Sequence, residues 1–346
     1  MGAHGPLIPE KTLDAAYFHG LDGLGGIHTI APEFTPPPSH IHLWNPTDPE
    51  DIKVEQAEKD MGEDCDFTPN LFTPVPTAAH THILELLRTS EPDTITIVAI
   101  GPLTNIALAA KADPETFSRV KEVVVMGGCL RVPGNVTPGG EFNVLADAEA
   151  SAIVYALTSK QPHTCLPPHL LPLSPLPKPL KLTLFPLDIT NQHMMPYKRF
   201  KEEIQDKQGP LGKWVKGFME TTYNTIKSLY TIDELARFGD RWGLEMHDPS
   251  CMYYLLALSQ NPQLPQWTFK IEDCRVETEG HFTRGVCVVD DRGRQRIAEG
   301  IEDGGSDSGN WLGWEAGTRV RVCTGTSGEE GLVGALLGGC FGGWEW

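Results

Sequence analysis

Amide and carboxylate side chains gather in a glycine-rich stretch of the chain between residues 127 and 143. Asn135, Glu141 and Asn143 lie there among glycines and prolines that favour turns. Together such side chains offer hydrogen-bond donors and acceptors, so at the mouth of a sheet they can bind the hydroxyl groups of a sugar. The same residue types are common in ordinary turns, and this stretch alone is a weak indication of a binding site.

A His-Asp pair precedes a predicted helix in the segment Glu-Met-His-Asp-Pro-Ser at 245–250, where Pro249 suits the first helical position. Asp248 either caps this helix or serves as an oxygen ligand for a hard cation, and the spacing favours neither interpretation. His247 is a candidate proton donor, because an unperturbed histidine ionises near neutral pH.

Two further loops carry polar residues. In Gly-Pro-Leu-Thr-Asn at 101–105, Thr104 or Asn105 either caps a helix or faces a ligand, and capping is the better supported interpretation. The segment 18–26 contains His19 and four glycines, so it is either a flexible lid over a pocket or a plain surface loop. It is not a phosphate-binding loop, since no Lys-Ser/Thr pair follows the glycines.

The elements that would position these loops alternate between strand and helix. Residues 94–100 and 122–126 are runs rich in β-branched residues that predict strands buried on both faces, and residues 103–111 predict a helix between them. This is a βαβ crossover, which indicates a parallel sheet. Further helices are expected at 146–157, 199–228 and 249–258, and strands within 182–189, near 276, and at 286–289 and 320–323. In open α/β sheets the ligand lies outside the carboxyl ends of the strands, where these loops would meet.

The chain of 346 residues, of which 40% are hydrophobic, is expected to form one α/β domain over residues 1–346. The predicted architecture is an open, mostly parallel sheet flanked by helices. Loop insertions are expected at about 35–80, which is rich in Pro, Asp and Glu, and at about 160–186, which contains eight prolines.

Composition argues against several classes of partner. The formal net charge of −18 disfavours nucleic acids and anionic membranes. Eighteen consecutive apolar residues occur nowhere, and the first residues lack the basic and apolar regions of a secretion signal, so a cytoplasmic location is expected. The eight cysteines are scattered without a CxxC pair, which indicates reduced thiols.

Seven blocks occur together and in order: FHGLDGLGG, TIVAIGPLTNIALAA, VVVMGG, GNVTPGGEFNVLADAEA, LDIT, MHDP and TRGVCVVDDRGR. Taken jointly they resemble the inosine/uridine-type nucleoside hydrolases over about two thirds of the chain. The resemblance implies a Rossmann-like core and an enzyme that hydrolyses the N-glycosidic bond of a ribonucleoside to a free base and ribose. It also implies a bound calcium ion and a possible homo-oligomer.

The resemblance assigns roles to individual positions. Asn135, Glu141 and Asn143 match the family residues that hold the ribose hydroxyls, and His247 matches a residue near the leaving base. His19 falls in the flexible loop that closes over the nucleoside. Oxygen ligands around the sugar and protonation of the departing base would both favour an oxocarbenium-like transition state.

The metal site is where the chain departs from the family pattern. Asp248 matches a calcium ligand, and Val125 occupies the position whose backbone carbonyl also binds the ion. The aspartate-rich DxDPGxDD motif, which supplies most other ligands and the base that activates water, occurs nowhere in the sequence. Calcium takes about six to eight oxygens, so weak or absent calcium binding is expected.

Three interpretations of the missing motif remain open, and each leaves the sheet without the family's first strands. The chain is an incomplete gene product or isoform, a family member that has lost catalysis, or a protein with a rearranged site. In a rearranged site Asp22, Glu141 or Asp188 would replace the missing carboxylates. The alternative functions are a nucleoside- or ribose-binding protein without turnover and a poorly folded remnant.

Overall fold

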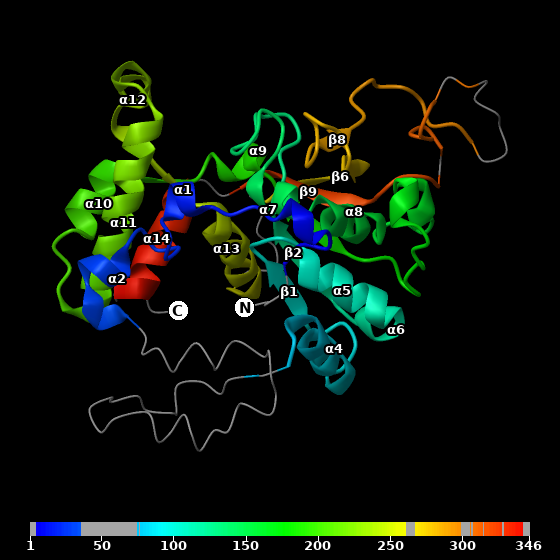
Figure 1. Ribbon diagram of the computed structural model, residues 1–346, viewed down its shortest axis with the longest axis horizontal. Helices are drawn as coiled ribbons and strands as arrows, with labels where there is room; N and C mark the ends of the chain where they lie inside the picture. The colour runs from blue at the N-terminus through cyan, green and yellow to red at the C-terminus, as the bar shows by residue number, and fades with distance from the viewer. Residues whose placement is uncertain are drawn as a thin grey trace.

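The computed structural model describes residues 5–35, 75, 77–260, 267–298, 305, 307–313, 315–326 and 329–341. Its main sheet has five strands in the order β1-β2-β3-β9-β6 (Figure 1). The strands are β1 (Thr96–Ala99), β2 (Glu122–Met126), β3 (Leu182–Phe185), β6 (Thr268–Glu272) and β9 (Val320–Gly325). The pairs from β1 to β9 are parallel, and β6 lies antiparallel to β9. The predicted open, mostly parallel α/β sheet is therefore confirmed.

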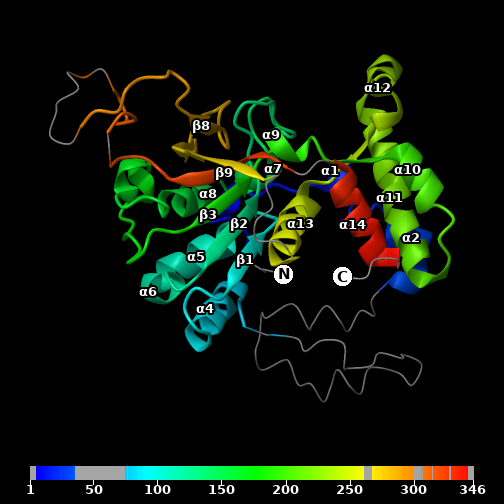
Figure 2. The same ribbon diagram turned by 180° about the vertical axis from the view of Figure 1, so that it is seen from behind.

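Helices cover both faces of this sheet. Successive side chains of β2 point to opposite faces, and each face packs into a different apolar cluster. Val123 and Val125 pack into the cluster that contains α4 (Ala79–Thr89), α5 (Thr104–Ala112) and α8 (Ala148–Ala156). Val124 and Met126 pack into a second cluster with residues of α13 (His247–Gln260). In both overall views β1 and β2 lie between α5 and α13 (Figures 1 and 2). The continuous apolar run of β2 thus reflects burial on both sides.

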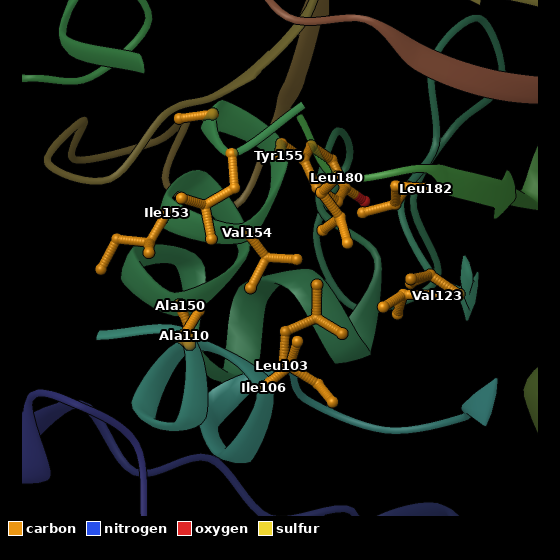
Figure 3. Close-up of a cluster of buried hydrophobic side chains, with 14 of the residues drawn as sticks. Leu103, Ile106, Ala110, Val123, Ala150, Ile153, Val154, Tyr155, Leu180 and Leu182 are labelled. Atoms are coloured by element: carbon orange, nitrogen blue, oxygen red, sulfur yellow. The ribbon is translucent and has the colours of Figure 1, made fainter. Parts of the chain in front are cut away.

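Small residues let α5 and α8 approach each other on the first face. Figure 3 shows Ile106 and Ala110 of α5 close to Ala150, Ile153 and Val154 of α8, with the strands beside them. Two short helices, α6 (Pro114–Phe117) and α7 (Phe142–Ala146), complete this side of the chain. Close packing at this junction fixes the carboxyl end of β2 relative to the loop that follows it.

A third apolar cluster joins the helices beyond α13. It includes residues of α10 (Tyr197–Glu203), α11 (Gly209–Leu229) and α14 (Glu329–Phe341), with the antiparallel pair of β4 (Met194–Pro196) and β5 (Gly243–Glu245). The short helices α1 (Ala16–His19) and α2 (Ile27–Ile30) pack against α11, and α12 (Ile232–Phe238) projects from the rest of the molecule (Figure 2). None of the helices in the described part of the chain is long and apolar enough to cross a membrane.

The structure differs from the sequence-based boundaries in several places. The strand expected within 182–189 ends at Phe185, because Pro186 interrupts it and α9 (Leu187–Thr190) follows. The insertion expected at 160–186 accordingly ends before β3, and it contains only short 3-10 turns at Pro162–Thr164 and Pro168–Leu170. Asp147 divides the helix expected at 146–157 into α7 and α8, since its carboxylate accepts a hydrogen bond from Ala150 N and caps α8. The expected insertion at 35–80 lies mostly outside the described residues, and the assignment of the whole chain to one domain stays a prediction.

A short hairpin of β7 (Cys274–Val276) and β8 (Cys287–Val289) flanks the sheet. The loop between its strands carries Arg284, which pairs with a buried carboxylate. Glu149 of α8 is 1% exposed and receives a two-pronged ion pair from Arg284, with nitrogen to oxygen distances of 2.6 and 2.7 Å. Lys11 binds the same carboxylate at 2.7 Å, so residues before α1 are anchored to the core through this group.

This anchor predicts a specific dependence of stability on pH. Burial alone would raise the pKa of Glu149, but hydrogen bonds from Arg284 and Lys11 outweigh it and lower the pKa from 4.5 to about 2. A carboxyl group with a lowered folded-state pKa stabilises the protein fully above its ordinary pKa and loses this contribution as the pH falls toward the folded value. We expect Glu149→Gln to reduce the free energy of unfolding at pH 6, and the difference from wild type to shrink at pH 3. Urea denaturation at both pH values measures this, with exposed Glu115→Gln as the control; an equal difference at the two pH values would contradict it.

Candidate active site

Glu141 organises the loop that leaves β2. Its carboxylate is 1% exposed and accepts hydrogen bonds from three backbone amides: Asn143 N at 2.9 Å, Gly128 N at 2.7 Å and Val144 N at 3.1 Å. The residue therefore caps the start of α7 and ties it to the carboxyl end of β2. Glycine at 127 leaves room for this carboxylate, since a Cβ there would lie 3.3 Å from a Glu141 carboxylate oxygen, a tight contact.

The two asparagines of this loop are held in different ways. Asn143 Nδ2 donates to the carbonyl oxygen of Met126 at 3.1 Å, and its Oδ1 has no hydrogen-bond partner among the described residues. Asn135 is exposed, and its Oδ1 accepts from Phe142 N at 3.0 Å. The structure thus brings Glu141 and Asn143 together at the end of β2, with Asn135 at the rim of the same loop. Free acceptor and donor atoms on both amides remain available to a ligand.

His247 is the first residue of α13, the helix on the other face of the sheet from α5 and α8. Its Nδ1 lies 2.8 Å from the Thr190 hydroxyl oxygen. Burial lowers the pKa of His247 to about 4. This value is well below the near-neutral pKa expected from the sequence. The reason is that few water molecules can reach the ring to stabilise its charged form. At neutral pH the imidazole is uncharged and can offer one N–H donor.

Asp248 follows directly and does not cap the helix, because its carboxylate makes no hydrogen bond within the described residues. The residue is exposed, although the protein atoms around it raise its pKa to about 6 by desolvation. Burial chiefly raises the pKa of Glu141, and the charge of Asp248 raises it further while the backbone amides oppose the shift. The loop after β2 and the start of α13 are thus close enough to share one electrostatic environment.

The carboxylates that could replace missing metal ligands are already engaged. Asp22 accepts backbone hydrogen bonds from Leu24 at 2.9 Å and Gly26 at 2.8 Å. Asp188 accepts from the backbone amides of residues 130 and 131, both at 2.8 Å, and Glu141 binds its three amides. Each of these carboxylates stabilises a loop through backbone hydrogen bonds, and this structural role needs no cation.

A calcium ion does not fit the donors in the described part of the chain. No three His, Cys, Asp or Glu side chains come together there in an arrangement that could hold a metal ion. Val125 lies in the parallel ladder between Ala99 and Leu184, and Asp248 is the one candidate ligand with a carboxylate free of described hydrogen bonds. Two donors fall well short of the about six to eight oxygens that calcium takes.

Two other candidate residues lie elsewhere. His19 is on α1, which packs against α11, and it makes no hydrogen bond to the other site residues in the described ranges. Thr104 is the first residue of α5 and does not cap it; its hydroxyl donates to Asp147 at 2.6 Å. Asp147 also accepts from Leu7 N at 2.9 Å, so its carboxylate has a structural role.

Sequence reasoning missed the element that connects the two halves of the site. In α9, Leu187 N donates to Gly128 O at 2.9 Å, Asp188 holds the loop after β2, and Thr190 contacts His247. The signal was present as the LDIT block immediately after a strand, but Thr190 carries no chemistry by itself. Its importance depends on a partner 57 residues away in the chain.

The chain is similar to several known proteins. The family described as "Inosine-uridine preferring nucleoside hydrolase" matches residues 1–330. The non-specific ribonucleoside hydrolase RihC of Salmonella newport is 30% identical over 270 residues, covering 73% of this chain and 72% of that protein. An uncharacterized protein of Schizosaccharomyces pombe is 32% identical over 211 residues, and the chain spans 55% of its length.

Solved structures show the same fold. A plant nucleoside hydrolase, PpNRh1, superposes with a TM-score of 0.61 at 21% identity, covering 97% of this chain and 77% of that one. An inosine-guanosine nucleoside hydrolase superposes with a TM-score of 0.59 at 20% identity, covering 96% and 78%. At this level of identity the similarity concerns the fold alone.

Proposed function

The chain belongs to the family of inosine-uridine preferring nucleoside hydrolases, and on that premise we propose that it hydrolyses the N-glycosidic bond of ribonucleosides to a free base and ribose. The observation that carries this proposal is the meeting of the Glu141 loop and the start of α13 at the carboxyl ends of the strands. One side offers amide groups for a sugar, and the other offers an imidazole N–H for a base.

In the proposed complex the ribose lies over the loop after β2. Asn143 Oδ1, the amide nitrogen of Asn135 and the Glu141 carboxylate bind its hydroxyl groups, and Glu141 also keeps the loop in place. His247 faces the base and stabilises charge that develops on it as the glycosidic bond lengthens. His19, the last residue of α1, stays a proposed substrate-binding residue that closes over the nucleoside. Asp248 and the Val125 carbonyl stay the proposed ligands of a calcium ion, which these two donors alone would hold no more than weakly, and no step is assigned to the ion.

A second candidate function is nucleoside or ribose binding without turnover. It is favoured by the engaged carboxylates Asp22, Glu141 and Asp188, and by the lack of a metal-holding group among the described residues. Titration calorimetry with inosine and uridine, with and without calcium, and an assay for released ribose separate the two functions. Release of ribose supports hydrolysis; binding without calcium dependence and without release supports the second function.

We also propose a ribonucleoside partner, a homo-oligomer and a cytoplasmic location. The location is supported by the thiols, since seven cysteines in the described part of the chain are free and six of them are buried. The net charge of −18 supports the expectation that nucleic acids are not partners.

Removal of the Asn143 amide tests the ribose site. We expect Asn143→Ala to weaken nucleoside binding more than about tenfold, because a ribose hydroxyl that loses its partner in the complex costs about 1 to 3 kcal/mol. Calorimetry with inosine measures this, and Asn224→Ala on the exposed surface of α11 is the matched control. Unchanged affinity in a folded Asn143→Ala protein would remove this residue from the site.

A further inference from the structure

The hydroxyl group of Thr190 is the only described hydrogen-bond partner of the His247 ring. Thr190 is fully buried, and its Oγ1 lies 2.8 Å from His247 Nδ1. Within the described residues this hydroxyl makes no other hydrogen bond. The contact joins the turn after β3 to the first residue of α13, so it acts across two elements that are distant in the sequence.

Burial of this pair determines which atom carries the proton. A neutral imidazole has one N–H donor and one nitrogen acceptor, whereas a hydroxyl can donate and accept. If Nδ1 carried the proton, the Thr190 hydroxyl would accept it and leave its own hydrogen buried without a partner, which is unfavourable. If Thr190 donates to Nδ1 instead, both groups are satisfied and the ring proton resides on Nε2.

From this geometry we propose that Thr190 is a positioning residue that holds His247 in the tautomer with the proton on Nε2. Since Nδ1 faces Thr190, Nε2 is the nitrogen left to donate a hydrogen bond to a substrate. The proposal deepens the function proposed above and rests on it, because the N–H on Nε2 would be directed at the departing base. Loss of the Thr190 hydroxyl would leave both tautomers accessible, and only one of them offers that donor.

The backbone around His247 is held independently of this hydroxyl. Met246 N donates to the carbonyl oxygen of His193 at 2.7 Å, and His193 N donates to Thr190 O at 3.0 Å. The segment from Thr190 to His193 therefore fixes two things. Its backbone holds the start of α13, and the Thr190 side chain holds the imidazole ring. A substitution that removes only the hydroxyl is expected to change the tautomer while the helix stays in place.

The test combines nitrogen NMR of the histidine rings with kinetics on inosine. Thr190→Val removes the hydroxyl at nearly constant volume, Thr190→Ser keeps it, and Thr222→Val is a matched control whose hydroxyl bonds within α11 at 2.9 Å. The signal of His247 among the 12 histidines is identified by its absence in His247→Gln. We expect wild type, Thr190→Ser and Thr222→Val to show the proton on Nε2, and Thr190→Val to show a mixture. We further expect kcat to fall about tenfold in Thr190→Val with KM within about twofold, and Thr190→Ser to recover it.

The outcomes separate this inference from the proposed function. A proton on Nδ1 in the wild-type protein, or an unchanged tautomer in Thr190→Val, overturns the role of Thr190 whatever the activity. If Thr190→Val does not fold, Thr190→Ala replaces it, and the wild-type spectrum still decides the tautomer. The expected spectra without any release of ribose support the positioning role and contradict hydrolysis alone.

Discussion

Replacement of His247 by alanine is expected to lower the rate of ribose release from inosine by about 10²- to 10⁴-fold, the range typical for loss of a positioned acid or donor group. Because burial keeps the ring neutral at neutral pH, the lost contribution is a hydrogen bond from an uncharged imidazole to the base. The KM should change less, since this bond strengthens as charge develops on the base.

An assay of released ribose with purified wild-type and variant proteins measures this effect. Exposed His163, in a loop away from the sheet's carboxyl edge, gives the matched control His163→Ala, which should retain wild-type activity. Equal activity of His247→Ala and wild type would exclude His247 from the reaction. No release by the wild-type protein, together with measurable nucleoside binding, would favour the binding function.

Replacement of Glu141 by alanine is expected to cost about 3 kcal/mol or more of unfolding free energy, roughly 1 kcal/mol for each backbone amide that loses its acceptor. The three amides are those of Gly128, Asn143 and Val144, and the carboxylate that serves them is 1% exposed. Water cannot readily replace a partner in so enclosed a position. The loop that carries Asn143 should become mobile, and nucleoside binding should be lost with it.

Urea denaturation of Glu141→Ala and Glu141→Gln tests this account. The glutamine variant keeps one carbonyl oxygen and is expected to lose only part of the stability. Glu234 provides a matched control, because it also accepts a backbone hydrogen bond at the start of a helix but is exposed, so Glu234→Ala should cost much less than Glu141→Ala. A loss in Glu141→Ala no larger than in Glu234→Ala would show that the three amides find other partners.

Local sequence was sufficient for the elements whose character depends on their own residues. The run Glu122–Met126 forms β2 with the predicted bounds, because β-branched residues in succession favour an extended chain buried on both faces. Pro114 begins α6 directly after Asp113, whose side chain accepts a hydrogen bond from Thr116 N, and both residue types are typical of a helix start. The α/β class followed from such segments, and the ordered blocks indicated the family.

Tertiary structure decided which polar residues have partners, because hydrogen bonds between distant segments leave no pattern in a local sequence. Glu141 has the residue type of a sugar ligand, but the local sequence does not show that its carboxylate also accepts hydrogen bonds from backbone amides of the loop after β2 and the start of α7. Asp248 has the residue type of a helix cap, yet it makes no hydrogen bond in the described part of the chain. His247 ionises far below its ordinary range because the packed segments around α13 remove water from the ring. Its partner Thr190 is 57 residues away, and only the return of the chain to the carboxyl edge of the sheet brings the two side chains within 2.8 Å.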